Sequence, residues 1–358
     1  MINGGFGILE IGNYPPPVCG WSIQATMVEE ELHRRGVAVA VLNINENRKQ
    51  KNSNCIDVQN GPDFVRKILR FAWKGYKFHI HFNAESPKGF LLSFVAALVG
   101  RLFRRGVVLS FHGGVPQHFF PVDRPVWLRA AFKILFQLGQ YVTCDSEEIR
   151  QAIIGYGIRP NRVKAIPCIS AELLEWRVVT LPTAVEEFLT QHRPLFFSYV
   201  RLREEYGFSV LLDAMALYAA EYPNCGFLWV GPSEREVEEI SRMINASSVN
   251  STNVMLLPNV HHDEFMTIMT RCLATIRIHS CDGISASVLE SLWVGVPVVA
   301  SNDCPRPPGV ITYDAQSGAD LVAKLRYVTD HDLDLKSQLM KPQIERNTDR
   351  IVDLLLCA

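Results

Sequence analysis

Two carboxylates and two hydroxyls lie close together in the segment Asp282-Gly-Ile-Ser-Ala-Ser-Val-Leu-Glu290. Asp282 and Glu290 are eight residues apart, which corresponds to about 12 Å if the segment is helical. This separation matches the reach from a sugar ring, past a diphosphate, to a ribose. A carboxylate at each end can accept hydrogen bonds from vicinal hydroxyls. The simpler alternative is that Asp282 caps a helix and Glu290 is a surface residue.

The neighbouring residues predict the backbone that would carry these groups. An apolar strand is expected up to residue 278, a polar loop with a glycine at 279–285, and a helix from Ala286 onward. Such a loop and helix start point backbone N–H groups and the positive end of the helix dipole at a ligand, which favours phosphate. Ser285 and Ser287 add hydroxyls there and can also cap the helix. Glu290 falls among apolar residues, where a buried carboxylate is costly unless it has a partner.

The rest of the chain alternates short apolar runs with longer amphipathic ones, a pattern typical of parallel sheets covered by helices. Its 358 residues suit two domains. In the first, strands are predicted at 6–12, 37–43, 77–82, 107–111, 140–144 and 163–166, and helices at 20–35, 62–74, 88–104, 124–138 and 146–155. In the second, strands are predicted at 195–199, 226–230, 253–256, 273–277 and 297–300, and helices at 208–221, 234–244, 262–270 and 285–294, with further helices in 316–357.

We therefore predict an α/β protein with two Rossmann-like parallel-sheet domains that face a central cleft. The first domain is expected at 1–170, the connection at 171–193, and the second domain at 194–340. A C-terminal helix at 341–358 could cross back to the first domain. Ligands of open α/β sheets bind beyond the carboxyl ends of the strands, so the cleft is expected to hold the active site.

The segment from Asp282 to Glu290, followed by Gly295-Val-Pro-Val-Val-Ala-Ser301, resembles the signature of the family 4 retaining glycosyltransferases of the GT-B fold. By this resemblance Asp282 would hold donor-sugar hydroxyls near the reacting carbon, and Glu290 would hold the nucleotide ribose. The donor site would also include the intervening residues Gly283, Ile284, Ser285 and Ser287. The first acidic residue of the family pattern is usually Glu, so the shorter Asp282 is expected to move or resize the sugar pocket.

Two landmarks in the first domain are similar to that family. The loop Tyr14-Pro-Pro-Pro-Val-Cys-Gly20 resembles the family's proline- and glycine-bearing loop under the donor phosphate, and Gly20 would allow close backbone approach. His112, in Leu109-Ser-Phe-His-Gly-Gly114, resembles a histidine that contacts the donor sugar and is a candidate catalytic residue. The alternatives are a simple turn at Gly20 and a core histidine at 112. Structural roles are expected for His79 and His81.

The segment Phe197-Ser-Tyr-Val-Arg201-Leu-Arg-Glu-Glu-Tyr-Gly207 resembles a motif in which an Arg and a Lys neutralise the donor diphosphate. Arg201 matches the Arg and is a candidate catalytic residue, whereas Tyr206 occupies the Lys position. Arg203 is the expected substitute for that Lys, and Arg306 is a second candidate whose alternative is a solvated side chain. Val260 lies in a segment that resembles the one framing the nucleobase.

Charge is unevenly distributed although the net charge is only −1. Residues 1–180 carry 22 Lys and Arg against 14 Asp and Glu, whereas residues 181–358 carry 14 against 23. The first half is therefore expected to meet something anionic, either a phosphate-bearing acceptor or a membrane surface contacted by the helices at 62–74 and 88–104. The alternatives are ordinary surface variation and a buried helix with a cationic end. Nucleic acid is not expected, because no recognition motif accompanies the charge.

The nine cysteines are scattered without Cys-x-x-Cys spacing, so neither a disulfide framework nor a zinc site is expected. The sequence shows neither a signal peptide nor an apolar run of the ~20 residues that a membrane-spanning helix needs. We expect a cytoplasmic protein, which could also contact the inner face of the membrane as a peripheral protein.

The family resemblance implies transfer of a sugar from a nucleotide diphosphate sugar to a hydroxyl acceptor, with retention and without a metal or cofactor. The acceptor would be a glycan, polysaccharide or glycolipid intermediate. Because Tyr206 replaces the Lys, the alternative is a donor-binding but weakly active protein that supports a partner enzyme. A nicotinamide-dependent oxidoreductase is rejected, because the glycines at 4, 5 and 7 do not follow the first strand as its dinucleotide loop requires.

Overall fold

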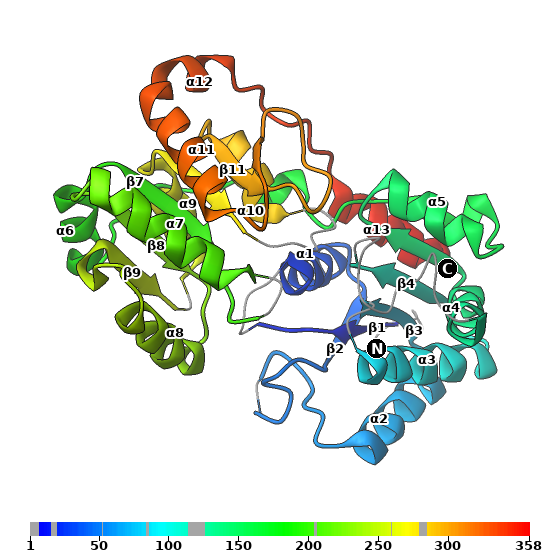
Figure 1. Cartoon of the computed structure of the whole chain (residues 1–358). Coiled ribbons are helices and arrows are strands. Elements are labelled where there is room, and N and C mark those ends of the chain that lie inside the picture. Colours follow the sequence, from blue (N-terminus) through cyan, green and yellow to red (C-terminus); the bar gives the residue numbers. More distant parts are fainter. Residues whose placement is uncertain are drawn as a thin grey trace. The chain divides into compact units, whose positions relative to one another are not determined.

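A computed structural model describes residues 7–15, 20–51, 53–83, 86–113, 126–203, 206–258, 260–278 and 285–358 of the protein. The chain forms two compact units, each with its own sheet (Figure 1). Unit 1 comprises Met1–Glu172 together with Ile344–Ala358, and unit 2 comprises Leu173–Gln343. The C-terminal segment from 344 onward thus belongs to the same unit as the N-terminal segment.

Unit 1 contains a six-stranded parallel sheet in the order β2-β1-β3-β4-β5-β6. Its strands are β1 (Gly7–Gly12), β2 (Ala38–Asn43), β3 (Lys77–Phe82), β4 (Val107–Phe111), β5 (Tyr141–Cys144) and β6 (Val163–Ala165). Its α-helices are α1 (Gly20–Arg34), α2 (Gly61–Trp73), α3 (Pro87–Leu102), α4 (Val126–Leu138), α5 (Glu147–Gly155) and α13 (Asn347–Cys357). Gly36 ends the first helical segment with a φ of 74°, a conformation that glycine adopts without strain.

Side chains that alternate along each strand form two apolar layers, one on each face of this sheet. Residues of α2, α3, α4 and α5 pack on one face against side chains such as Leu9, Ile80 and Leu109. Residues of α1 and α13 pack on the other face, against Ile8 and Val108. Both faces are covered, which explains why the strands are continuous apolar runs in the sequence.

Helix α13 is fixed to unit 1 by apolar and ionic contacts. Ile351, Val352 and Leu355 are fully buried against α1 and the sheet. Arg35, just after α1, pairs with Asp349 at 3.0 Å and with Asp353 at 2.5 Å. The end of the chain therefore completes the layer that α1 begins.

Unit 2 contains a second six-stranded parallel sheet, in the order β12-β11-β10-β7-β8-β9. Its strands are β7 (Leu195–Tyr199), β8 (Gly226–Val230), β9 (Val254–Leu257), β10 (Ala274–Arg277), β11 (Val298–Ser301) and β12 (Ile311–Tyr313). Its α-helices are α6 (Thr183–Gln191), α7 (Phe208–Glu221), α8 (Glu234–Ala246), α9 (His262–Thr270), α10 (Ala286–Trp293), α11 (Gly318–Asp330) and α12 (Asp332–Gln338).

Two elements of unit 2 were not predicted from the sequence. Helix α6 lies in the segment that was interpreted as a connection, and its side chains Val185, Phe188 and Leu189 pack on β7 and β8. The structure thus places this segment in unit 2. Strand β12, a short strand of three residues beyond β11, was not predicted either.

The predicted fold class is confirmed: two parallel sheets with flanking helices form two Rossmann-like units. All eleven predicted strands are present, with bounds that differ by one residue or less at the described ends. Among the described residues, no helix combines the length and the apolar character needed to cross a membrane.

Candidate active site

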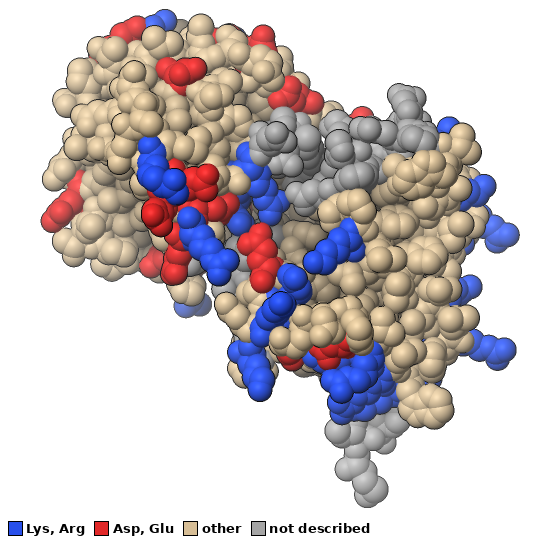
Figure 2. All heavy atoms as spheres, turned by 60° about the horizontal axis from the view of Figure 1, so that its bottom comes forward, with Lys and Arg blue, Asp and Glu red and all other residues tan. Residues whose placement is uncertain are grey.

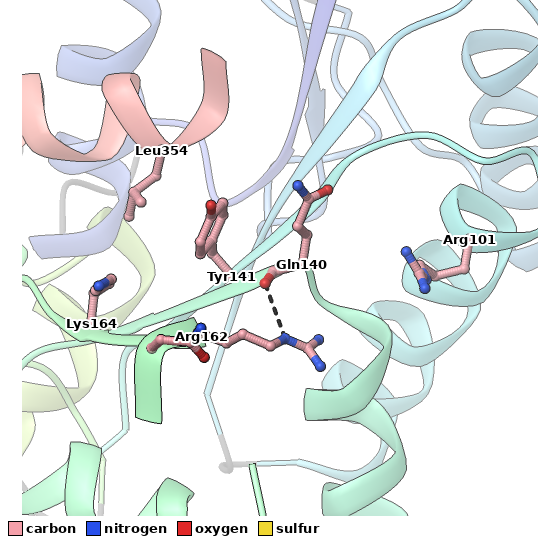
Figure 3. A pocket seen from close by; sticks show the side chains of 7 residues that line it. Arg101, Gln140, Tyr141, Arg162, Lys164 and Leu354 are labelled. Atoms are coloured by element: carbon pink, nitrogen blue, oxygen red, sulfur yellow. Dashed lines mark hydrogen bonds between the residues drawn. The ribbon is translucent and has the colours of Figure 1, made fainter. Parts of the chain in front are cut away.

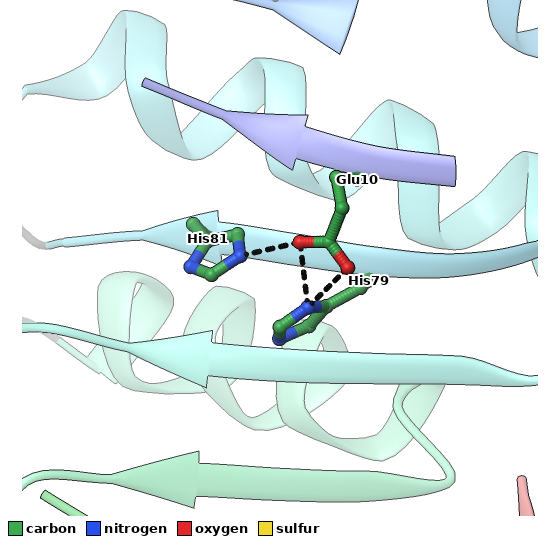
Figure 4. Close-up of side chains that lie close together, drawn as sticks. All are labelled: Glu10, His79 and His81. Carbon is green, nitrogen blue, oxygen red and sulfur yellow. Dashed lines mark hydrogen bonds and ion pairs between the residues drawn. The ribbon is translucent and has the colours of Figure 1, made fainter. Parts of the chain in front are cut away.

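A buried polar cluster lies on two neighbouring strands of unit 1, with Glu10 on β1 and two histidines, His79 and His81, on β3 (Figure 4). All three side chains are at most 1% exposed. His79 Nδ1 lies 2.8 Å from the carboxylate of Glu10, and His81 Nε2 lies 2.9 Å from its Oε2. The strand register brings them together, because Glu10 is directly opposite His79 in the parallel ladder.

The cluster continues across the sheet to β4 and β5. His79 Nε2 lies 2.7 Å from Ser110 Oγ, which lies 2.7 Å from Thr143 Oγ1. His81 Nδ1 lies 3.0 Å from Nε2 of His112, the predicted sugar-contacting histidine at the end of β4. The two imidazole rings are stacked with an interplanar angle of 7°. His112 is therefore the outermost member of a network that starts at Glu10.

The charges of this network follow from its burial and its contacts. Burial raises the pKa of Glu10, but His79 and His81 outweigh that effect and lower the pKa to about 2. Burial and the neighbouring His79 lower the pKa of His81 to about 3, against the influence of Glu10. At neutral pH Glu10 is thus a carboxylate and His81 is neutral.

These protonation states determine the direction of the hydrogen bonds. A carboxylate only accepts, so Nε2 of His81 donates to Glu10 and its Nδ1 must accept. The donor to that Nδ1 is Nε2–H of His112. The other ring nitrogen of His112, Nδ1, lies 3.7 Å from Asp145 Oδ2. The network thus orients the ring of His112 through Glu10 and His81.

Glu10, His79 and His81 are also side chains of the types that ligate transition metals, and their ligand atoms lie within 4.8 Å of one another. Each histidine nitrogen that faces Glu10 is already within hydrogen-bonding distance of the carboxylate. The cluster is therefore complete as a hydrogen-bonded network, which agrees with the structural role expected for the two histidines.

Gly20, the predicted glycine of the phosphate loop, is the first residue of α1. A Cβ at this position would lie 3.6 Å from Cys168 Sγ, an ordinary contact, so packing in unit 1 tolerates a side chain there. The ring of the next residue, Trp21, lies 5.7 Å from that of His112. The start of α1 and the end of β4 are therefore neighbours, as the predicted site requires.

In unit 2, Arg201 follows β7 and is 5% exposed. Its Nε donates to Glu236 Oε2 at 2.9 Å, and Glu236 also forms the capping box at the start of α8 with Ser233. Burial raises the pKa of Glu236, but hydrogen bonds from Ser233 and the charge of Arg201 outweigh it and hold the pKa below its usual value. Arg201 is thus anchored at the carboxyl end of β7 by a charged partner.

The position expected for a lysine holds Tyr206, whose side chain is buried in the core of unit 2. Its ring centroid lies 5.6 Å from the guanidinium of Arg277, the last residue of β10. The ring of Tyr199, at the end of β7, lies 5.9 Å from the same guanidinium. Arg203, the substitute predicted from the sequence, is exposed in the turn after β7.

Arg306 lies beyond the carboxyl end of β11 and donates through Nε to the Ser301 carbonyl at 2.9 Å. A second donor of its guanidinium bonds Ser301 Oγ, also at 2.9 Å. The strands β7, β10 and β11 are adjacent in the sheet. Arg201, Arg277 and Arg306 are therefore three cations at neighbouring strand ends, which is a suitable arrangement for a polyanion.

Helix α10 starts at the same edge of the sheet. Ser285 occupies the N-cap position, but its side chain does not cap the helix as was expected. Its Oγ instead lies 3.2 Å from that of Ser287. The N–H groups of the first helical turn lack intrahelical acceptors and are suited to an anion.

Glu290 on α10 is only 3% exposed, so it is not a surface residue. Its Oε1 lies 2.9 Å from Nε2 of His262, the first residue of α9, whose side chain is 28% exposed. This histidine is the partner that a buried carboxylate needs. Among the described residues, the other carboxylate oxygen of Glu290 has no hydrogen-bond partner and can accept from a ligand hydroxyl.

Of the remaining predicted site residues, the structure describes only Val260. Val260 precedes α9 and packs against the apolar cluster behind β7 and β8. Asp282, Gly283 and Ile284 lie outside the described residues. The sequence did not single out Glu10, Arg277 or His262 as site residues. Of these, only Glu10 had a visible signal, a lone carboxylate within an apolar strand.

A separate hollow of about 510 Å³ lies at the other end of the strands of unit 1 (Figure 3). Its lining comes from α3, from β5 and the residue before it, from the 3-10 turn Pro160–Arg162, from β6 and from α13. The lining residues are Arg101, Gln140, Tyr141, Asn161, Arg162, Lys164 and Leu354. Gln140 and Tyr141 are at the amino end of β5, whereas ligands of such sheets bind at the carboxyl ends. This hollow is thus distinct from the predicted site.

Solved structures with the same fold cover nearly the whole chain. HepE of Anabaena, solved in complex with UDP-glucose, is 14% identical, with a TM-score of 0.67 over 98% of this chain and 99% of that one. Sucrose-phosphate synthase of Thermosynechococcus elongatus is 15% identical, with a TM-score of 0.66 over 98% and 94%. UDP-GlcNAc 2-epimerase of Neisseria meningitidis, bound to UDP-GlcNAc, is 13% identical, with a TM-score of 0.65 over 99% and 100%.

Two family profiles match the sequence in succession. The profile described as Glycosyltransferase Family 4 matches residues 20–169, which contain Gly20 and His112. The profile described as Glycosyl transferases group 1 matches residues 184–320, which contain the three strand-end arginines and α10. With both units matched in order, and with two Rossmann-like parallel sheets, the chain belongs to the family 4-type glycosyltransferases of the GT-B fold.

Proposed function

We propose that the protein transfers a sugar from a nucleotide diphosphate sugar to a hydroxyl of a glycan, polysaccharide or glycolipid intermediate, with retention and without a metal ion. The observation that carries this proposal is in unit 2. There three arginines, the start of α10 and the buried Glu290 meet at the carboxyl edge of one sheet. A diphosphate requires cations and N–H donors, and the hydroxyls of a ribose require a carboxylate that accepts their hydrogen bonds.

Glu290 accepts hydrogen bonds from the ribose hydroxyls through the oxygen that His262 leaves available. The N–H groups at the start of α10 and the hydroxyls of Ser285 and Ser287 bind the phosphates. Asp282, which precedes them in the chain, holds hydroxyls of the donor sugar. Val260 precedes α9 and lies beside the nucleobase, where main-chain groups provide the contacts.

The departing diphosphate gains negative charge in the transition state, and fixed cations stabilise it. Arg201 supplies one such cation and Glu236 holds it in place. Arg277 supplies the charge of the missing lysine, because the rings of Tyr199 and Tyr206 hold its guanidinium at the adjacent strand end. Arg203 remains the alternative source, from an exposed position.

In unit 1, His112 contacts the donor sugar and Gly20 lets the backbone approach the phosphate. Glu10 and His81 act through His112 by keeping its ring in one orientation. Asp-x-Asp, a sequence able to chelate a metal-bound diphosphate, occurs in this chain at 330–334. That stretch covers the end of α11 and the start of α12, where Asp332 pairs with Lys336 at 2.8 Å, and it contains none of the residues proposed here for the donor site.

Thermal unfolding in the presence of a panel of UDP- and GDP-sugars tests the donor site, since a bound donor stabilises the folded protein by mass action. Glu290→Gln should abolish the stabilisation, whereas Glu187→Gln, an exposed residue of α6, should leave it intact. No stabilisation by any donor would contradict the proposal.

NMR of the products then identifies the reaction. A new glycosidic bond of the donor's anomeric configuration supports retaining transfer, and an inverted bond contradicts it. A free epimerised sugar indicates an epimerase instead. Donor binding without turnover favours the alternative of a weakly active protein that supports a partner enzyme.

A further inference from the structure

Helices α2, α3 and α4 form a continuous layer on one face of the sheet of unit 1. Each helix buries one side in the core, for example through Ile68, Ala96 and Phe132. The opposite sides of the three helices face outward, and together they make one surface of unit 1. We call this surface the outer helical face.

Large apolar side chains are concentrated on the outer helical face. Trp73 is 80% exposed, and Leu102 and Trp127 are each 70% exposed. Eight of the thirteen exposed large hydrophobic residues of the described chain are on these three helices: Leu69, Trp73, Leu91, Leu98, Leu102, Val126, Trp127 and Ile134. Apart from the adjacent pair Val126 and Trp127, successive members within a helix are four or seven residues apart, which places them in lines along the surface.

Cations lie on the same helices and the turns that end them. The exposed ones are Arg66, Arg70, Lys74, Lys88, Arg101, Arg104, Arg129 and Lys133. In the described part of 61–138 the only acidic residue is Asp63, which pairs with Arg66 and Lys67. Figure 2 shows Lys and Arg side chains projecting along the right-hand edge, in unit 1, with no acidic side chain beside them.

The basic character continues into the hollow at the end of α3. Arg101 lines it together with Arg162 and Lys164, and among the described residues no carboxylate does (Figure 3). Burial and the charges of Arg101 and Arg159 lower the pKa of Arg162. Arg162 is held in place by the carbonyls of Gln137 and Gln140. An anion placed here would relieve the repulsion between these cations.

We propose that the outer helical face binds the surface of an anionic lipid bilayer, with the hollow at its border receiving a headgroup phosphate. The bilayer surface is the partner that provides both phosphates for the cations and an apolar layer for Trp73, Leu102 and Trp127. Tryptophan is favoured at this depth because its ring is apolar with one polar N–H. Nucleic acid would match the cations but would leave the aliphatic side chains Leu91, Leu98 and Ile134 exposed.

Membrane binding through this face would also affect how the acceptor reaches the site, and this consequence rests on the proposed transfer reaction. The helices run alongside the strands of unit 1, so a bilayer on the outer helical face extends parallel to the strands. The carboxyl ends of β3 and β4, with His81 and His112, then open along the membrane surface. A hydroxyl acceptor carried by a lipid can reach that edge without leaving the bilayer.

Co-sedimentation of the full chain with vesicles tests the proposal, in the absence of any donor or acceptor, so that its outcome is independent of the transfer reaction. Binding to vesicles of phosphatidylcholine with 30% phosphatidylglycerol is compared with binding to phosphatidylcholine alone. We expect binding only to the anionic vesicles, and a marked loss at 1 M salt, where the Debye length is about 3 Å.

Two pairs of variants separate this face from the rest of the surface. Arg70→Gln/Lys74→Gln should weaken vesicle binding by about 30-fold, whereas Arg235→Gln/Arg242→Gln on α8, with the same change of net charge, should not. Trp73→Ser/Leu102→Ser should weaken it by about 10-fold or more, unlike Leu217→Ser/Leu333→Ser in unit 2. Equal effects within either pair would overturn the proposal, as would binding of inorganic phosphate without binding of vesicles.

Discussion

The guanidinium of Arg277 lies 5.6 Å from the ring centroid of Tyr206, although the two residues are 71 positions apart in the sequence. Tyr206 occupies the position where the family pattern has a lysine. The chain thus has an aromatic ring where a cation is usual, and a cation is held against that ring from the adjacent strand β10. If Arg277 takes the role proposed for it, the positive charge of the site comes from β10 instead of from the segment after β7.

The first prediction concerns this charge. Arg277→Ala should weaken donor binding by about 10- to 100-fold, because a charge-assisted hydrogen bond contributes about 1.5–3 kcal/mol. Arg203→Ala, in an exposed turn, should change it by less than about 3-fold. Isothermal titration with the donor found in the thermal screen measures both. A larger loss for Arg203→Ala would assign the role of the lysine to Arg203.

Glu290 and His262 give a second prediction. His262→Ala removes the partner of a buried carboxylate, so the donor affinity should fall by about 10-fold or more. His262→Gln can still donate a hydrogen bond from its amide and should retain most of the affinity. Donor titrations of the two variants provide the comparison. If both variants bind the donor as the natural protein does, Glu290 does not depend on His262.

The depressed pKa of His81 gives a third prediction, about stability. His81 is neutral in the folded protein down to about pH 3, whereas in the unfolded chain it takes up a proton near pH 6.5. The contribution of His81 to the free energy of unfolding is therefore complete above pH 6.5 and is lost as the pH falls towards 3. This one group changes the free energy of unfolding by at most about 1.4 kcal/mol per pH unit.

Denaturant unfolding of the natural protein and of His81→Asn, measured between pH 7 and 4, checks this expectation. The variant keeps an amide that can donate to Glu10, but it cannot titrate in this range. Its free energy of unfolding should fall less steeply with acid. Parallel pH profiles for the two proteins would show that His81 is not the group responsible.

A fourth prediction concerns helix α13. Ile351→Ala should lower the free energy of unfolding of unit 1 by about 2–5 kcal/mol, because the side chain is fully buried between α1 and the sheet. Asp353→Asn on the same helix breaks an exposed ion pair with Arg35 and should cost less than about 1 kcal/mol. Chemical denaturation of each variant measures the difference, and similar losses for both would contradict the assigned packing.

The regular elements were predictable because their signals are local. A strand buried on both faces is a continuous apolar run, and eleven predicted strands alternate with helices in the order typical of a parallel sheet covered on both faces. Helix α6 was not predicted because its segment was interpreted as the connection between the domains, although it has nine residues like α5 and α9, which were predicted. The apolar neighbours of Glu290 indicated that a carboxylate buried there would need a partner, and the structure shows Glu290 buried with His262 as that partner.

The site residues that escaped prediction depend on strand order. His79 and His81 visibly share one side of a strand, but their partner Glu10 is on β1, and β1 pairs with β3 only because β2 lies at the edge. Arg277 is likewise an ordinary strand residue until β10 is placed beside β7. Contacts between distant segments are decided by the assembled sheet, and no local period in the sequence reports them.

Because the C-terminal helix α13 belongs to unit 1, it affects the order in which the two units can finish folding during synthesis. Translation proceeds from the N-terminus, so residues 173–343 leave the ribosome before α13 does. Unit 2 can close its own core while the α1 side of the first sheet still lacks Ile351, Val352 and Leu355. The unit that is synthesised first is therefore the one that is finished last.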